Sequence, residues 1–209
     1  MPVDVNLPKE GMIFQREQYQ KGGVGRLYWD YRDSEILKYI EDEKIIVDIG
    51  CGEGILMEKI IQRLPDVKVF GIDLSFENVS ICKEHGLKVC SGSVYGLPLD
   101  DSSLECVLFI EVIEHLDEPE SAIKEINRVL KKDGFLILLF PHDSFFKLAR
   151  ILTFKFREAF YNAGHVRQWT PKEMVGLLES SGFRIVSKKN IPFYIWSISL
   201  HCLIVAKRL

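Results

Sequence analysis

Three glycines and two acidic residues have the types and spacing of a ligand site. Gly50, Gly52 and Gly54 follow a short apolar stretch and precede apolar residues at helical spacing. Glycine permits a tight strand-to-helix turn and lets a ligand approach the backbone closely. Asp48 comes two residues before the first glycine, and Asp73 ends the next apolar stretch. Because the N–H groups of the following helix point at this turn, the stretch predicts a nucleotide-type site built from backbone.

The spacing of the glycines separates this loop from the dinucleotide-binding fingerprint. The pattern G-x-G-x-x-G would place its third glycine at position 55, which is Ile55. An acid at Asp48 suits a cationic or ammonium-bearing ligand better than a pyrophosphate. Asp73, at the tip of a second strand, can accept hydrogen bonds from ribose hydroxyls. Together these features favour a nucleoside that carries an amino acid and lacks phosphates.

These motifs resemble, in order and spacing, the class I S-adenosylmethionine-dependent methyltransferases. The subgroup that they resemble includes the ubiquinone and menaquinone biosynthesis methyltransferases. The resemblance is strong over about 44–140 and looser in the C-terminal third. The matching stretches are Asp48-Ile49-Gly50-Cys51-Gly52-Glu53-Gly54, Gly71-Ile72-Asp73-Leu74-Ser75, Gly92-Ser93-Val94, Leu97-Pro98-Leu99, Glu111-Val112-Ile113-Glu114-His115-Leu116 and the residues 128–134.

The resemblance implies S-adenosyl-L-methionine as the cofactor. It implies that Asp48 and the glycine loop hold the methionine end, with Glu111 near the amine, and that Asp73 holds the ribose. The family commonly has an acid at the position of Ser93, so here the serine hydroxyl or the backbone of Val94 would meet the adenine amino group. The implied cofactor-binding residues are Asp48, Gly50, Cys51, Gly52, Gly54, Asp73, Leu74, Ser93, Val94 and Glu111.

Methyl transfer from a sulfonium needs close, aligned reactants more than it needs a nucleophile in the protein. For an oxygen or nitrogen acceptor, a base would remove a proton. The candidate catalytic residues are His165, His142 and Glu111. The ordinary pKa of an imidazole, near 6.5, suits His165 to this role. His165 could equally hold a neighbouring segment through hydrogen bonds.

Glu111, Glu114 and His115 have i, i+3, i+4 spacing, which would place them on one face if the segment is helical. Two carboxylates and an imidazole can bind a divalent metal. Some small-RNA 3′-end methyltransferases and some quinone-pathway O-methyltransferases use a similar arrangement. The alternative is the ordinary exit of the fourth strand in this family, which assigns no metal ligand, and we favour it.

The apolar pattern predicts the elements that must position these residues. The resemblance implies an α/β, Rossmann-like class I methyltransferase fold. Its sheet would have seven mostly parallel strands, an antiparallel last strand beside the sixth, and helices on both faces. Strands are expected at 44–47, 67–72, 87–91, 104–110, 135–140, 183–188 and 199–207, and helices at 27–40, 55–61, 75–85, 118–130 and 171–181.

The length of 209 residues suits one domain. We expect an N-terminal arm and cap helix over 1–43, a cofactor-binding core over 44–140, a lid insertion over 141–170, and a C-terminal helix and strands over 171–209. In the cap helix the predicted buried residues are Leu27, Tyr31, Ile36, Leu37 and Ile40, while Tyr19, Tyr28 and Trp29 would either line a site or cover an edge of the core.

The segment 145–161 contains six aromatic and four basic residues. By the resemblance it would help to form the lid over the acceptor, and it could contact a membrane surface peripherally. The other interpretation, which we favour, is a helix that packs its apolar side on the sheet and leaves its basic side in solvent.

Composition limits the classes of function. An apolar content of 47% and a net charge of −3 are ordinary for a soluble globular protein and give no general basic field for nucleic acid. Five cysteines without C-x-x-C spacing favour thiols in a reducing, cytoplasmic compartment. We expect neither a signal peptide nor a membrane-spanning helix.

The sequence thus predicts a methyltransferase that acts on a small-molecule or lipid-like acceptor. Two alternatives stay open. One is a metal-assisted O-methyltransferase that uses Glu111, Glu114 and His115 on a quinone-precursor or RNA-end acceptor. The other is a non-catalytic protein that binds the cofactor. A nicotinamide oxidoreductase is disfavoured by the glycine spacing and by the strand-four exit motif. The sequence does not indicate an oligomeric state.

Overall fold

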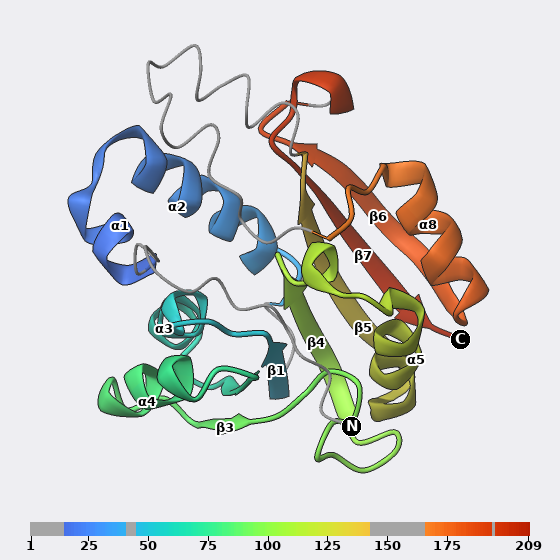
Figure 1. Ribbon diagram of the computed structural model, residues 1–209, viewed down its shortest axis with the longest axis horizontal. Helices are drawn as coiled ribbons and strands as arrows, with labels where there is room; N and C mark the ends of the chain where they lie inside the picture. Colours follow the sequence, from blue (N-terminus) through green and yellow to red (C-terminus); the bar gives the residue numbers. More distant parts are fainter. Residues whose placement is uncertain (1–14, 41–44, 143–165, 194) are drawn as a thin grey trace.

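A seven-stranded sheet forms the centre of the fold (Figure 1). The computed structural model describes residues 15–40, 45–142, 166–193 and 195–209. The strand order is β3-β2-β1-β4-β5-β7-β6, and neighbours are parallel except that β7 runs antiparallel to both β5 and β6. The predicted fold class is confirmed. The strands are β1 (Ile45–Ile49), β2 (Lys68–Asp73), β3 (Val89–Ser91), β4 (Leu104–Ile110), β5 (Leu130–Pro141), β6 (Phe183–Ile191) and β7 (His201–Arg208).

Helices cover both faces of the sheet. In Figure 1, α2, α3 and α4 lie to the left of the central strands, and α5 and α8 lie to the right. Helix α1 joins the left-hand group through α2. The helices are α1 (Gln15–Lys21), α2 (Gly23–Leu37), α3 (Ile55–Arg63), α4 (Phe76–Glu84), α5 (Pro119–Val129) and α8 (Pro171–Ser180), with short 3-10 turns η1 (Ile113–His115) and η2 (Trp196–Ile198).

The core consists of two layers, one on each face of the sheet. Alternate residues of β4 enter different layers: Leu108 packs with α2 and α3, and Phe109 packs with α5 and α8. Because both faces are covered, β4 reads in the sequence as a nearly continuous apolar run. The amphipathic helix predicted at 118–130 is confirmed as α5, and its residues Ile123 and Ile126 are completely buried.

Side-chain caps fix where two helices begin. The hydroxyl of Ser75 accepts a hydrogen bond from the backbone N–H of Asn78 at the start of α4, at 3.3 Å. Thr170 and Glu173 form a capping box at the start of α8. Both caps were predicted from the sequence, and they set the register of helices that pack on opposite faces of the sheet.

Two predictions about local structure are wrong. Leu27 is 70% exposed rather than buried, because only the last turns of α2 reach the sheet, where Ile36 and Leu37 are buried. The stretch 131–134, predicted as a turn, lies inside β5. The register passes from Leu104 opposite Leu130 to Cys106 opposite Phe135, so these four residues bulge out of an otherwise continuous strand.

Several predictions concern segments outside the described residues. They include residues 1–14 of the N-terminal arm, the lid segment 145–161 and the candidate base His165. The division into arm, core, lid and C-terminal part therefore stays a prediction. Within the described ranges, no helix has the length and apolar character to cross a membrane.

Candidate active site

The glycine loop lies where β1 ends and α3 begins. Gly50 has a φ of 76°, in the left-handed region that favours glycine. A Cβ at this position would collide with the side chain of Val112, which follows β4. Glycine is thus required at position 50 both by the backbone and by the closeness of the neighbouring strand's exit. Gly54, with a φ of 77°, is the residue from which α3 starts.

Asp73 joins the end of β2 to the glycine loop. One carboxylate oxygen, Oδ2, accepts a hydrogen bond from the backbone N–H of Gly52 at 2.8 Å. The other, Oδ1, accepts from the N–H of Ser75 at 2.8 Å and from the side-chain amide of Asn78 at 3.1 Å. A carboxylate offers about four acceptor positions. These three donors leave a position on Oδ2 where a ligand hydroxyl can bind.

Asp48 is a second acid at the same edge of the sheet, and it is only 3% exposed. Burial, together with the negative charges of Asp73 and Asp33, raises the pKa of Asp48 to about 7. A buried acid of this kind in a cleft is typical of a functional position. A cationic group beside it would favour the ionised carboxylate and would itself be held by it.

Four parts of the chain line the cleft above this edge. Its lining includes Gln15 of α1 and Trp29 of α2. It also includes Asp48 and Gly50 at the end of β1, and Glu111, which follows β4. Cys51, another residue of the predicted site, is buried in the same wall. The cleft is therefore lined by predicted site residues that lie in or directly after β1 and β4. Residues of the N-terminal helices also line it.

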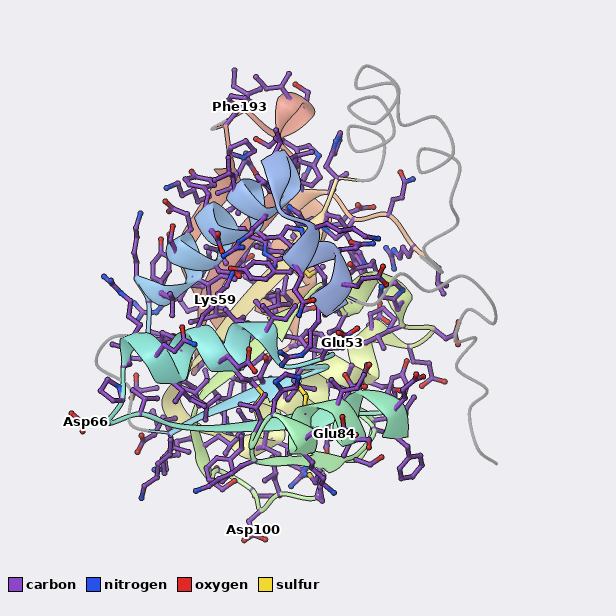
Figure 2. The ribbon with its side chains drawn as sticks, turned by 90° about the vertical axis from the view of Figure 1, so that its left-hand side faces the viewer. Glu53, Lys59, Asp66, Glu84, Asp100 and Phe193 are labelled. Atoms are coloured by element: carbon purple, nitrogen blue, oxygen red, sulfur yellow. The ribbon has the colours of Figure 1, made fainter. Side chains whose placement is uncertain are left out.

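Helix α1, which the sequence did not predict, contacts the glycine loop directly. The carboxylate of Glu53 accepts hydrogen bonds from the backbone N–H groups of Gln15 at 2.7 Å and Arg16 at 2.9 Å. The guanidinium of Arg16 donates to the carbonyl of Glu53 and forms an ion pair with Glu58 at 2.9 Å. Glu53 is buried, and in Figure 2 it lies below the N-terminal helices. The loop thereby holds the helix that covers it.

Glu111 leaves β4 with an unusual backbone. Its φ is 54°, so the chain turns sharply instead of starting a helix, and only Ile113–His115 form a short 3-10 turn. The condition under which Glu111, Glu114 and His115 would share one face, a helical segment, is therefore not met. Within the ranges that the structure describes, no group of three His, Cys, Asp or Glu residues is placed to hold a metal ion.

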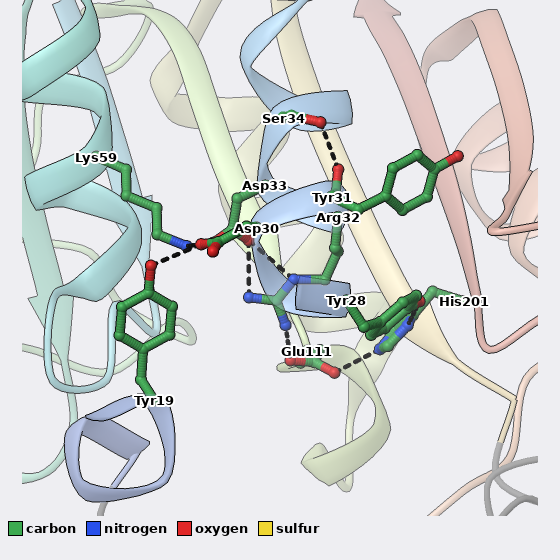
Figure 3. A network of polar contacts seen from close by, with 10 residues as sticks. All are labelled: Tyr19, Tyr28, Asp30, Tyr31, Arg32, Asp33, Ser34, Lys59, Glu111 and His201. Carbon is green, nitrogen blue, oxygen red and sulfur yellow. Dashed lines mark hydrogen bonds and ion pairs between the residues drawn. The ribbon is translucent and has the colours of Figure 1, made fainter. Parts of the chain in front are cut away.

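The carboxylate of Glu111 lies between two cationic or polar partners (Figure 3). Its Oε2 forms an ion pair with Nη1 of the buried Arg32 at 2.6 Å, and its Oε1 is 2.5 Å from Nε2 of His201. The other ring nitrogen of His201, Nδ1, is 2.6 Å from the hydroxyl of Tyr28. The rings of Tyr28 and His201 stack, with centroids 5.7 Å apart.

His201 was missed by the sequence analysis, and so was its partnership with Tyr28. The only sequence feature that could have pointed to His201 is its position near the start of the last predicted strand. Pairing of β7 with β5 sets His201 opposite Pro141, at the edge where ligands of open α/β sheets bind. Trp29, proposed to line a site or to cover the core, lines the cleft.

The remaining predicted residues lie in several places. The ring of His142 packs edge-on against Trp196, with centroids 4.4 Å apart. The hydroxyl of Ser93 accepts a hydrogen bond from the N–H of Tyr95 at 3.3 Å, beyond the end of β3. Val94 is buried, and Leu74 is exposed directly after Asp73. The residues predicted around the ribose and adenine therefore lie at or directly after the ends of β2 and β3, next to the loop after β1. They are Asp73, Leu74, Ser93 and Val94.

Comparisons with known proteins show which proteins this chain is similar to. Residues 47–138 match the family model described as a methyltransferase domain. A probable S-adenosylmethionine-dependent methyltransferase of Mycolicibacterium smegmatis is 27% identical over 76% of this chain and 60% of its own length. A ubiquinone biosynthesis O-methyltransferase of Pelagibacter ubique is 31% identical over 44% of this chain and 40% of its own length.

The fold agrees with these sequence matches. The crystal structure of a SAM-dependent methyltransferase from Archaeoglobus fulgidus superimposes with a TM-score of 0.71 and 17% identity, over 93% of this chain and 99% of that one. The fold is that of the class I S-adenosylmethionine-dependent methyltransferases, and residues 47–138 are similar to a methyltransferase domain. The chain spans less than two thirds of the length of the two curated relatives above.

The similarity to methyltransferases implies S-adenosyl-L-methionine as the cofactor, and the residues present fit it. The acceptor position left on Asp73 suits a ribose hydroxyl. The buried Asp48 suits the cationic amino acid end, and Val112 leaves no room for a side chain on Gly50 beside it. The ribose and the amino group of the ligand thus each have an acid of matching chemistry.

Proposed function

We propose that this protein transfers a methyl group from S-adenosyl-L-methionine to an oxygen or nitrogen atom of a small-molecule or lipid-like acceptor. One observation carries the proposal. Asp48 and Asp73, at the ends of adjacent parallel strands, flank a glycine loop whose Gly50 tolerates no Cβ. Two acids on either side of this loop fit a ligand with a ribose at one end and a cation at the other.

The residues of the chain would bind and orient the reactants. Asp73 would hold the ribose, Asp48 the ammonium, and Leu74, Ser93 and Val94 would surround the adenine. When bound, the cofactor supplies a methyl group that its sulfonium already activates. Helix α1 and Trp29 would exclude water from above, which favours an in-line displacement.

The composition of one segment and the name of one similar protein support this class of acceptor. The segment 145–161, outside the described residues, carries six aromatic and four basic residues, a composition that suits an apolar acceptor with an anionic group. We propose that the same segment contacts a membrane surface if the acceptor is a lipid. The name of the Pelagibacter ubique relative supports an oxygen acceptor. The metal-assisted alternative has less support, because Glu111, Glu114 and His115 do not share a helix face in the described part of the chain.

Calorimetric titration with S-adenosylmethionine and S-adenosylhomocysteine tests the cofactor. We expect both to bind the wild-type protein, and Asp73→Asn to bind about 10- to 100-fold more weakly, as expected for the loss of charge-assisted hydrogen bonds. The amide would also turn a donor toward the N–H of Gly52, which now donates to Asp73.

Asp66→Asn is the matched control, because Asp66 is an exposed acid at the surface, away from the cleft (Figure 2). It should bind like the wild type. Transfer of labelled methyl groups to extract fractions would then separate an enzyme from a binding protein. Absence of binding at millimolar cofactor would overturn the proposal.

A further inference from the structure

Tyr28, His201 and Glu111 form a continuous hydrogen-bonded chain from three distant parts of the sequence (Figure 3). The two links are 2.6 Å and 2.5 Å long. His201 is 1% exposed, while Tyr28 is partly exposed. Buried polar groups require such partners in any fold, so the chain alone does not establish a function.

The charges around Glu111 set the direction in which protons can move. Arg32, buried and ion-paired with Glu111, favours the ionised carboxylate. An ionised carboxylate only accepts hydrogen bonds, so Nε2 of His201 must carry the proton that points at Glu111. Nδ1 of a neutral His201 is then an acceptor, and the Tyr28 hydroxyl donates to it. The lone pairs of the Tyr28 oxygen remain to accept a second hydrogen bond.

The chain lies on the side of the cleft opposite Asp73. Glu111 follows β4 and His201 begins β7, whereas Asp73 ends β2, across β1. Glu111 and Arg32 line the cleft itself. Tyr28 precedes Arg32 by four residues on α2 and so projects from the same side of that helix. A ligand that begins at Asp73 and passes Asp48 therefore points toward this chain.

We propose that Tyr28, His201 and Glu111 are a proton relay that deprotonates the methyl acceptor, with Tyr28 as the catalytic residue and His201 and Glu111 as positioning residues. This relay rests on the proposed methyl transfer. The acceptor O–H or N–H proton passes to the Tyr28 oxygen as the proton of Tyr28 passes to Nδ1 of His201. The electron pair of the acceptor atom forms the bond to the methyl carbon, and the pair of the broken carbon–sulfur bond stays on sulfur.

The electrostatics agree with a relay rather than with a tyrosinate base. Burial and the negative charge of Glu111 raise the pKa of Tyr28 above its ordinary value. The phenol therefore stays protonated near neutral pH and cannot take a proton without giving one up. His201 is placed to receive that proton, and the Glu111 carboxylate, 2.5 Å from Nε2, stabilises the imidazolium that results.

Acceptors that differ in acidity distinguish a relay from a structural contact. The probes are catechol, which is protonated at pH 8, and 4-nitrocatechol, which is largely ionised there and needs no base. We expect Tyr28→Phe to lower kcat for catechol about 100-fold or more. Its kcat for 4-nitrocatechol should stay within a few-fold of wild type, and its calorimetric affinity for S-adenosylmethionine should be unchanged.

Tyr31→Phe is the matched control. Tyr31 is on the same helix, and Figure 3 shows its ring pointing away from His201 and Glu111. It should retain wild-type rates with both catechols. An equal loss for both acceptors in Tyr28→Phe, or no loss for either, would overturn the relay.

A second measurement decides the relay without turnover. In ¹⁵N-histidine spectra, the signal that disappears in His201→Gln identifies His201. We expect it to be the neutral tautomer with its proton on Nε2 at pH 7.5. A proton on Nδ1, or on both nitrogens, would exclude the relay. If the wild type binds the cofactor but methylates neither catechol, catechols are not its acceptors, and a proton on Nδ1 in these spectra would still overturn the relay.

Discussion

Asp48→Asn is expected to make the protein more stable at pH 8 while it weakens the binding of S-adenosylmethionine by about 100-fold. The loss in binding corresponds to roughly 3 kcal/mol, the size of a buried charge-assisted interaction. Asparagine keeps the shape of the side chain, so the fold should persist. Calorimetric titration and denaturant unfolding of the same preparations would measure both effects.

The gain in stability follows from the pKa of Asp48. It is about 7 in the folded protein, because burial and the charges of Asp73 and Asp33 oppose ionisation, and about 3.9 in an unfolded chain. Since the folded pKa is the higher one, the contribution of Asp48 to stability is fully present below about pH 4 and is lost as pH rises toward 7. Asparagine does not ionise, so the variant should gain roughly 1–4 kcal/mol at pH 8 and little at pH 4.

Cofactor binding to the wild type should depend on pH for the same reason. Only the ionised Asp48 attracts an ammonium group, so affinity should rise about tenfold between pH 5.5 and pH 7. Asp48→Asn should lose this dependence, and Asp66→Asn should keep it. Equal affinity of the wild type and Asp48→Asn across this range would show that Asp48 does not face the cofactor.

Gly50→Ala is expected to abolish detectable cofactor binding and to lower the free energy of unfolding by about 2–4 kcal/mol. Two costs combine. A left-handed φ of 76° costs about 1–2 kcal/mol for a residue with a Cβ. The added methyl also collides with Val112, and overpacking of this kind costs about 1–3 kcal/mol. Titration and chemical unfolding would measure the two losses.

Two further variants separate these costs. Gly86 has a φ of 75° and no atom within 4 Å of an added Cβ, so Gly86→Ala should show the backbone cost alone and bind the cofactor normally. Adding Val112→Ala to Gly50→Ala should restore part of the stability, because the collision is removed while the left-handed backbone remains. If Gly50→Ala binds like the wild type, the loop does not approach the ligand.

The fold was predictable because periodicity and capping chemistry agree along most of the chain. The apolar run of β4 gave its bounds at 104–110, and Ser75 and Thr170 marked the starts of two helices. The glycine loop was predictable for a different reason. Its tight turn requires a left-handed backbone, which favours glycine. That local requirement gives a recognisable glycine pattern, independent of contacts elsewhere in the chain.

Contacts between distant segments were not predictable in this way. Nothing near His201 in the sequence points to Tyr28 or Glu111, since only the tertiary fold brings α2, the end of β4 and the start of β7 together. Glu111 itself was chosen correctly, but its helical spacing with Glu114 was misleading, because a single left-handed residue breaks the helix. Helix α1 was missed because it has no buried residue and is held mainly by polar contacts such as those to Glu53.

The position of β7 has a consequence for how the protein is made. This strand lies between β5 and β6 although it follows both in the chain. During synthesis, β6 therefore emerges with no neighbour in the sheet, and one edge of β5 stays open until β7 has left the ribosome. Open strand edges pair readily with other chains. His201 is the first residue of β7. The pairing of β7 with β5 and β6 therefore closes this edge and brings His201 into the proposed relay in the same folding step.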